Sequence, residues 1–132
     1  MARKPRLELS PLELEIMNVI WDLGECTSAD VIAEFTKKRQ LANTTIRTVL
    51  ANIRKKGYLD VVPSVEPRIR FRPRVTRRAV TRRTVKHLLT NMFGDSPRDA
   101  IAFLLEEEDM DERELAEIRR MLDEHGSGSE EE

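Results

Sequence analysis

Cysteine is almost absent from this sequence, with Cys26 alone among 132 residues. A single thiol excludes a disulfide within the chain and cannot by itself form a thiolate metal cluster. We interpret Cys26 as a small packing residue near the start of a helix. The two histidines, His87 and His125, lie far apart and have no ligand at metal-binding spacing. We therefore predict no metal site and no cofactor.

Long hydrophobic runs are also missing. No stretch of about 18 apolar residues is present, so the sequence predicts no membrane insertion. The first ten residues, MARKPRLELS, carry charge but no apolar segment of signal-peptide length. Apolar residues make up 39% of the chain and recur with regular periodicity, which argues against disorder. We expect a soluble, cytoplasmic protein.

Signatures of catalysis are lacking as well. The chain has no phosphate-binding glycine loop, no nucleophile elbow and no paired catalytic groups. Gly94-Asp95-Ser96 superficially resembles the serine block of one hydrolase class, but it falls between two expected helices rather than after a strand. We interpret Ser96 as a helix cap and predict that the chain is not an enzyme. A hydrolase that uses Ser96 is the least favoured alternative.

Basic residues outnumber acidic ones in the first part of the chain, and acidic residues outnumber basic ones in the rest. Residues 1–92 hold 19 Lys/Arg and 9 Asp/Glu, a net charge of +10, whereas residues 93–132 hold 4 and 15, a net charge of -11. The overall charge of -1 conceals this split. A dense basic block favours a polyanionic partner, and an acidic block would repel one. The sequence thus separates a partner-binding segment from an assembly segment.

Local start and stop signals predict three helices in the first half. Ser10 to Glu13 form a capping box before a helix over residues 11–23, which Gly24 ends. Thr27 or Ser28 caps a second, short helix. Asn43 is expected to cap a third helix that runs through Lys56 to Gly57.

The third helix has the most informative pattern. Ile46, Val49, Leu50 and Ile53 form one apolar stripe, and the opposite face carries small polar and basic residues without acids. Such a face can enter a DNA major groove without a clash. The candidate DNA contacts on this helix are Asn43, Thr44, Thr45, Arg47, Thr48, Asn52, Lys55 and Lys56.

Two short strands, 58–62 and 69–72, are expected to form a hairpin with a proline-bearing loop. Alternation places Ile69 and Phe71 toward the core and Arg68, Arg70 and Arg72 outward as candidate phosphate contacts. Three helices followed by such a ribbon are typical of a winged helix-turn-helix, so we predict a mainly α protein with a small β-hairpin.

Apolar stripes on three short helices follow residue 76. They are too few and too short to bury themselves well alone, and twofold pairing also suits palindromic DNA. We predict a homodimer, although packing onto the first domain of the same chain is an open alternative. The candidate dimerisation residues are Leu88, Leu89, Met92, Phe93, Ile101, Leu104, Leu105, Leu115, Ile118, Met121 and Leu122.

We therefore divide the chain into a winged-helix DNA-binding domain over residues 1–75, a helical dimerisation domain over 76–125 and a flexible acidic tail over 126–132. The predicted function is repression of transcription by binding palindromic, double-stranded operator DNA until a signal relieves it. The alternative is a winged-helix module whose basic face binds an acidic protein, without sequence-specific DNA binding.

Three blocks carry a resemblance to a known family: LSPLELEIMNVIWDLGECTSADV, NTTIRTVLANIRKKGYL and the MFGDSP turn before the acidic helices. Over residues 7–124 the chain resembles the BlaI/MecI/CopY (penicillinase repressor) family of winged-helix repressors. The resemblance implies a dimer with interlocked C-terminal helices, recognition helices in successive major grooves, and repression by occlusion. It also implies that residues 44–48 begin the base-reading segment and that residues 68–72 belong to the wing.

The chain departs from the family pattern in three places. Copper-responsive members have a C-terminal cysteine cluster, and this chain has no cysteine after Cys26, so the resemblance gives no support for copper sensing. In the penicillinase repressors, a membrane sensor peptidase acts upstream and triggers cleavage at an Asn-Phe bond, where this chain reads Ala102-Phe103-Leu104. The wing has Ile69 where an aromatic residue is common.

Overall fold

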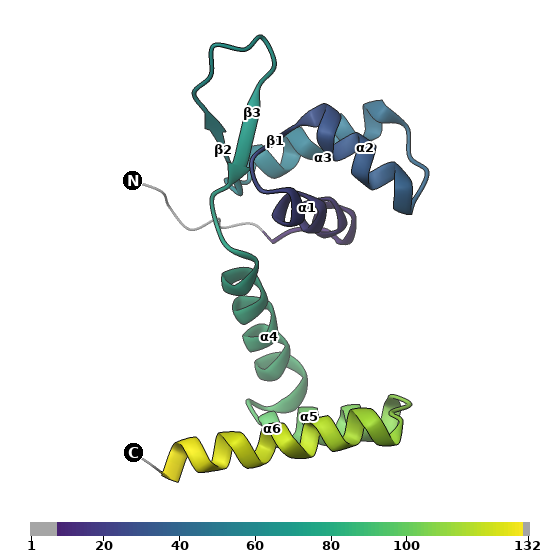
Figure 1. Cartoon of the computed structure of the whole chain (residues 1–132), viewed down its shortest axis with the longest axis vertical. Coiled ribbons are helices and arrows are strands. Elements are labelled where there is room, and N and C mark those ends of the chain that lie inside the picture. The colour runs from purple at the N-terminus through teal and green to yellow at the C-terminus, as the bar shows by residue number, and fades with distance from the viewer. Residues whose placement is uncertain (1–7, 131–132) are drawn as a thin grey trace. The chain divides into compact units, whose positions relative to one another are not determined.

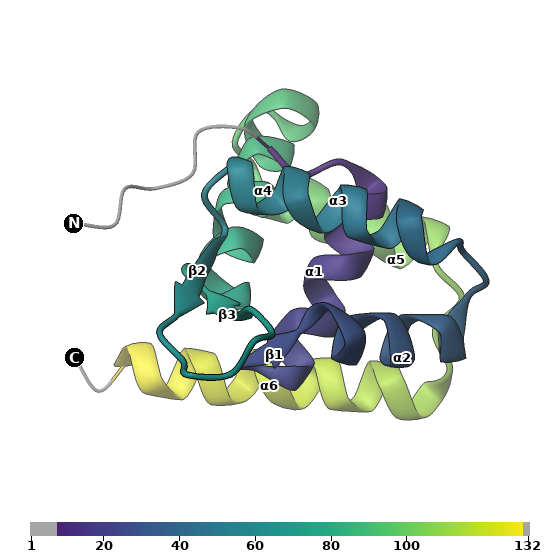
Figure 2. The same cartoon turned by 90° about the horizontal axis from the view of Figure 1, so that it is seen from above.

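The computed structural model describes residues 8–130, with side chains through Ser127. It is mainly helical, as predicted, with six helices and a small antiparallel sheet among the described residues (Figures 1 and 2). The chain divides into two compact units, the first ending at Arg83 and the second beginning at Thr84.

Reciprocal caps start the first two helices. At α1 (Pro11–Leu23), the Ser10 amide donates to the Glu13 carboxylate over 2.7 Å and the Glu13 amide donates to the Ser10 hydroxyl over 3.2 Å. Gly24 ends α1 at φ 78°, a backbone angle that favours glycine. Thr27 caps α2 (Ser28–Lys38) in the same way, together with Asp30. The capping box predicted at Ser10 is confirmed.

Helix α3 (Asn43–Lys55) begins one residue earlier than predicted. Ala42 is the N-cap, Asn43 is the first helical residue, and no side chain caps the helix. The prediction that Asn43 is the cap is therefore wrong. Ala42 has the extended backbone of an N-cap, so Asn43 is the first residue of the helix. The Asn43 side chain lies exposed on the first turn of α3.

The sheet has three strands in the order β1-β3-β2, formed by β1 (Cys26–Thr27), β2 (Leu59–Val62) and β3 (Arg70–Pro73). Phe71 is the central residue, paired with Cys26 on one side and Val61 on the other. Strand β1 was not predicted, because two residues are too short for an alternating pattern. The expectation that Ile69 faces the core is wrong: β3 starts at Arg70, so Ile69 stays in the loop and is 56% exposed.

One apolar core holds the first unit together. Its fully buried side chains come from α1, α2, α3, the sheet and the turn after α3: Ile16, Met17, Ile20, Cys26, Val31, Ile46, Ile53 and Tyr58. The Trp21 indole packs at the edge of this core and donates a 3.0 Å hydrogen bond to the Val75 carbonyl. This core fixes α3 and the strands relative to each other.

The first turns of α4 (Arg77–Phe93) belong to the first unit. Val80 is buried, and Arg77 donates to the Asn18 carbonyl and to the Asp22 carboxylate over 2.9 and 2.8 Å. The Arg77 guanidinium also lies 5.5 Å from the centre of the Trp21 ring. The first compact unit consequently includes the start of α4 up to Arg83.

The second unit contains the rest of α4 together with α5 (Pro97–Glu107) and α6 (Glu112–Glu130). Ser96 caps α5 by accepting from the Asp99 amide over 3.1 Å, which confirms its predicted role. The prediction that Gly126 ends the last helix is wrong, since α6 continues to Glu130. Once earlier turns have formed, each further residue adds a hydrogen bond, and a glycine costs only about 1 kcal/mol. Of the tail predicted to be flexible, residues 131–132 lie outside the described residues.

Candidate nucleic-acid interface

Helix α3 presents the face that the sequence singled out. Its apolar stripe, Ile46, Val49, Leu50 and Ile53, is buried against the core of the first unit. The opposite face is exposed along its whole length. The exposed residues predicted as DNA contacts on α3 are Asn43, Thr44, Thr45, Arg47, Thr48, Asn52 and Lys55.

The chemistry of this face suits the edges of base pairs. Hydroxyl, amide and guanidinium groups can donate or accept hydrogen bonds there, and α3 has no acidic residue to repel phosphate. The Thr48 hydroxyl donates to the Thr44 carbonyl over 2.9 Å, so its oxygen keeps lone pairs that can accept. A helix with such a face can lie in a major groove.

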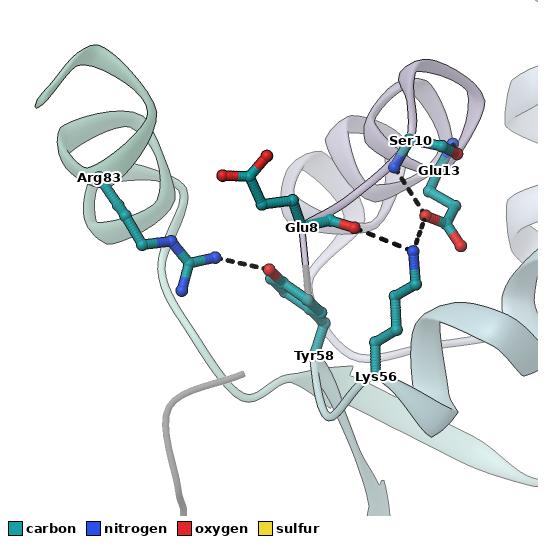
Figure 3. A network of polar contacts seen from close by, with 6 residues as sticks. All are labelled: Glu8, Ser10, Glu13, Lys56, Tyr58 and Arg83. Atoms are coloured by element: carbon teal, nitrogen blue, oxygen red, sulfur yellow. Dashed lines mark hydrogen bonds and ion pairs between the residues drawn. The ribbon is translucent and has the colours of Figure 1, made fainter. Parts of the chain in front are cut away.

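Lys56 lies apart from the other predicted contacts. Its ammonium group donates to the Glu13 carboxylate over 2.6 Å and to the Glu8 carbonyl over 2.9 Å (Figure 3). Its side chain is only 22% exposed, and that of Glu13 only 7%. The structure therefore gives Lys56 a contact at the start of α1, and the exposed set on α3 ends at Lys55.

The Glu13 carboxyl is ionised in this contact. Burial opposes its charge, but the hydrogen bonds from Lys56 and from Ser10, together with the Lys56 charge, outweigh burial and hold the pKa of Glu13 below its ordinary value. Close by, the Arg83 guanidinium donates a 2.6 Å hydrogen bond to the Tyr58 hydroxyl (Figure 3). These two contacts hold both ends of the turn that follows α3.

The three wing arginines have different surroundings. Wing here means β2, β3 and the loop 63–69 between them, which projects beyond the helices in Figure 1. Arg68 and Arg72 are exposed, whereas Arg70 pairs with Glu66 of the same loop over 3.3 Å. Arg68 and Arg72 can therefore contact a phosphate directly. Arg70 can do so by exchanging the Glu66 carboxylate for the phosphate.

Arg68 and Arg47 meet at one recess. A hollow of about 300 Å³ is lined by Arg47 of α3, Arg68 and Ile69 of the wing, and Thr27, Ser28 and Ala29 at the start of α2. Two guanidinium groups beside a helix N-terminus form an electropositive surface that favours a phosphate. The sequence did not indicate that Ser28 and Ala29 line the same recess as Arg47 and Arg68. Thr27 marks the helix start, but no local pattern links that start to the wing.

Apolar side chains are exposed on the second unit. Among the predicted dimerisation residues, Leu89, Phe93, Leu115 and Ile118 are half-buried. The others remain exposed, at 48 to 70% of their surface: Leu88, Met92, Ile101, Leu104, Leu105, Met121 and Leu122. Exposed apolar area of this extent is typical of a surface that another protein covers.

A groove of about 420 Å³ runs through this apolar surface. It is lined by Leu88, Met92, Phe93, Ala100, Phe103 and Leu104, without a charged residue among them. The rings of Phe93 and Phe103 meet edge to face with 5.8 Å between their centres. Phe103 was not among the predicted residues, although it is 50% exposed beside Leu104.

Other candidate chemistry has little structural basis. Burial raises the pKa of the Cys26 thiol to about 11, which keeps it neutral and agrees with a packing role. Within residues 8–130 no three His, Cys, Asp or Glu side chains gather where a metal ion could bind. No helix in that range has the length and apolar character needed to cross a membrane.

The sequence of this chain is similar to those of known repressors. A sequence model described as "Penicillinase repressor" matches residues 9–124. The chain is 24% identical over 122 residues to a penicillinase repressor of Staphylococcus aureus, covering 92% of this chain and 95% of that protein. It is 25% identical over 115 residues to "Methicillin resistance regulatory protein MecI" of Mammaliicoccus sciuri, covering 87% and 93%. The solution structure of the DNA binding domain of the repressor BlaI is similar at 30% identity and a TM-score of 0.48, over 58% of this chain and 90% of that domain.

Proposed function

Because this chain belongs to the penicillinase repressor family, whose members are DNA-binding repressors and not enzymes, we propose that it is a homodimer that binds a palindromic operator and blocks transcription. The match confirms the family resemblance seen in the sequence and the prediction that the chain is not an enzyme. Operator geometry, dimerisation and relief of repression are the parts that we propose.

The exposed face of α3 is the observation that carries the proposal. Arg47, Thr48 and Asn52 would reach base edges, because their side chains are exposed opposite the buried stripe. Lys55, Arg68 and Arg72 would contact phosphates. The recess between Arg47 and Arg68 would receive one backbone phosphate and so set the position of α3 relative to the strand. Lys56 leaves the set of contacts because it is held by Glu13.

The apolar surface of the second unit supports the homodimer. A second copy would cover the groove formed by Leu88, Phe103 and Leu104 with an identical apolar surface. Two α3 helices related by a twofold axis would then match two half-sites of a palindrome. Such a protein acts where the promoter is, in the cytoplasm.

The signal that relieves repression is also part of the proposal. The family resemblance implies a membrane sensor peptidase that acts upstream of the repressor. A gene for such a peptidase beside the gene for this chain would support that partner.

A binding titration tests the function. The full chain is titrated against labelled DNA from its own upstream promoter and against unrelated DNA of equal length, over a series of salt concentrations. We expect tighter binding to the promoter, with log affinity falling linearly with log salt at about -0.9 per neutralised phosphate. Equal affinity for both DNAs with a flat salt response would contradict DNA recognition and favour an acidic protein partner.

A further inference from the structure

Helix α4 carries a row of exposed cations that neither the core nor the DNA-binding face uses. Arg78, Arg82 and Lys86 recur every four residues, so they share one face of the helix over about 12 Å. We call these three residues the α4 stripe. The other two arginines of the helix point elsewhere, Arg77 to Asp22 and Arg83 to Tyr58. Within the part of the chain that the structure describes, no side chain forms an ion pair with the stripe.

The stripe begins where a helix tolerates cations least. The partial positive charge at a helix N-terminus repels Lys and Arg and favours Asp and Glu. Helix α4 has Arg77 and Arg78 in its first turn and no acid anywhere along its length. A binding partner with negative charge would offset this unfavourable placement.

The opposite charge stands at the end of α5. Glu106, Glu107, Glu108 and Asp109 follow one another, all four are exposed, and no described side chain forms an ion pair with them. We call this segment the acidic turn. Its negative charge is also unfavourable at this position, because a helix C-terminus carries partial negative charge and the last turn of α5 contains no basic residue. A cationic partner would offset that cost.

We propose that the α4 stripe of one copy binds the acidic turn of a second copy. The inference rests on the proposed homodimer and specifies how its two chains are aligned. Two features support it. Phe93 lies seven residues after Lys86 on the same face of α4, and Glu107 lies three residues after Leu104 on the same face of α5, so both charged segments adjoin residues that line the apolar groove. An apolar centre with a charged rim is the usual composition of a protein interface, and twofold symmetry would form each contact twice.

Charge reversal tests the pairing in the full chain. One variant carries Arg78→Glu, Arg82→Glu and Lys86→Glu, and the other carries Glu106→Lys, Glu107→Lys and Glu108→Lys. Alone, each variant places like charges opposite each other, so its dimer dissociation constant should be about tenfold higher than that of wild type at the same salt concentration. Mixed in equal amounts, the two variants form a heterodimer in which one contact joins opposite charges of reversed sign and the other keeps the original charges. Sedimentation should show this heterodimer to be about as tight as the wild-type dimer.

Several outcomes would overturn the inference. A mixture that associates no better than the separate variants would mean that the contact does not join two chains. A reversal of Lys37, Lys38 and Arg39 at the C-terminal end of α2 changes the net charge by the same amount, and an equal loss of dimer in that variant would mean that only net charge matters. A milder set, Arg78→Gln, Arg82→Gln and Lys86→Gln, keeps the test open if a reversed chain does not fold. If that set weakens DNA binding and leaves the dimer unchanged, the stripe contacts DNA instead.

The proposed function can fail separately. A wild-type chain that remains a monomer at micromolar concentration would overturn the homodimer itself. A wild-type dimer whose dissociation constant responds neither to salt nor to the reversed charges would overturn the stripe pairing alone.

Discussion

Lys56 and Glu13 stand 43 residues apart in the sequence, yet a 2.6 Å hydrogen bond joins the Lys56 ammonium to the Glu13 carboxylate. The same carboxylate accepts the Ser10 amide at the start of α1. The contact therefore fixes the turn at the C-terminal end of α3 to the first turn of α1. Both side chains are largely shielded from water. Loss of one partner should therefore cost more stability than loss of one partner of an exposed ion pair.

Replacing one partner of this pair should destabilise the first unit. At neutral pH, Lys56→Met leaves a shielded carboxylate without its cation, and we expect it to lower the free energy of unfolding by about 1–3 kcal/mol. Chemical denaturation measures the change. Glu15→Gln is the matched control, since Glu15 pairs with Arg39 over 2.7 Å at an exposed position and should cost less than about 0.5 kcal/mol. Equal effects of the two substitutions would contradict the assigned role of Lys56.

The same pair makes stability depend on pH. Because the pKa of Glu13 is lower in the folded chain than in the unfolded chain, its contribution is complete above the unfolded value of about 4.5 and is lost as the pH falls through the folded value. Wild type should lose unfolding free energy between about pH 5 and pH 3 more steeply than Glu13→Gln. Denaturation curves at several pH values measure both slopes. Parallel slopes would show that Glu13 titrates alike in both states.

The sequence predicted those features that depend on neighbouring residues. The capping box at Ser10, the stop at Gly24 and the buried stripe of α3 follow from spacings of three or four residues, and the structure contains all of them. The start of α3 was predicted one residue late because Asn43 is a better cap than Ala42, whereas the backbone turned without any side-chain cap.

Contacts between distant segments could not be predicted in this way. The side chain of Lys56 resembles any other cation on a basic helix until Glu13 is found beside it. Ile69 fits the alternation of β3, but the strand begins after it because β1 and β2 pair only from Arg70 onward. The recess between Arg47 and Arg68 likewise needs α3, the wing and the start of α2 to be folded together.

Arg47→Ala should distinguish base reading from general attraction to DNA. If Arg47 reaches a base edge, the substitution lowers affinity for the promoter by about 1–3 kcal/mol and affinity for unrelated DNA much less. Arg39→Ala is a matched control, because it removes one positive charge from the C-terminal end of α2 at a position paired with Glu15. Binding to both DNAs is measured at one salt concentration. Equal losses on the two DNAs would assign Arg47 to phosphate contact alone.

The wing should contribute without regard to sequence. Removing Arg68 and Arg72 together takes away two exposed cations, so binding to promoter and to unrelated DNA should weaken by similar factors. The salt slope should become shallower by about 0.9 for each phosphate that the variant no longer neutralises. Arg74→Ala is the control, since Arg74 is held by Asp60 over 2.7 Å. An unchanged slope would remove the wing from the interface.

A charge placed in the apolar groove should separate the two copies. Leu104 is 48% exposed and lines the groove with Leu88 and Phe103, so Leu104→Glu would leave a carboxylate in an apolar interface if a second copy covers it. That desolvation cost should raise the dimer dissociation constant at least about tenfold, while circular dichroism still shows the helices of each chain. Val65→Glu introduces the same charge at a wing residue that is fully exposed, and it should leave sedimentation unaltered. Since two half-sites are bound together only by a dimer, Leu104→Glu should also weaken binding to a full palindrome far more than binding to a single half-site. A Leu104→Glu chain that still sediments as a dimer would place the interface elsewhere on the second unit.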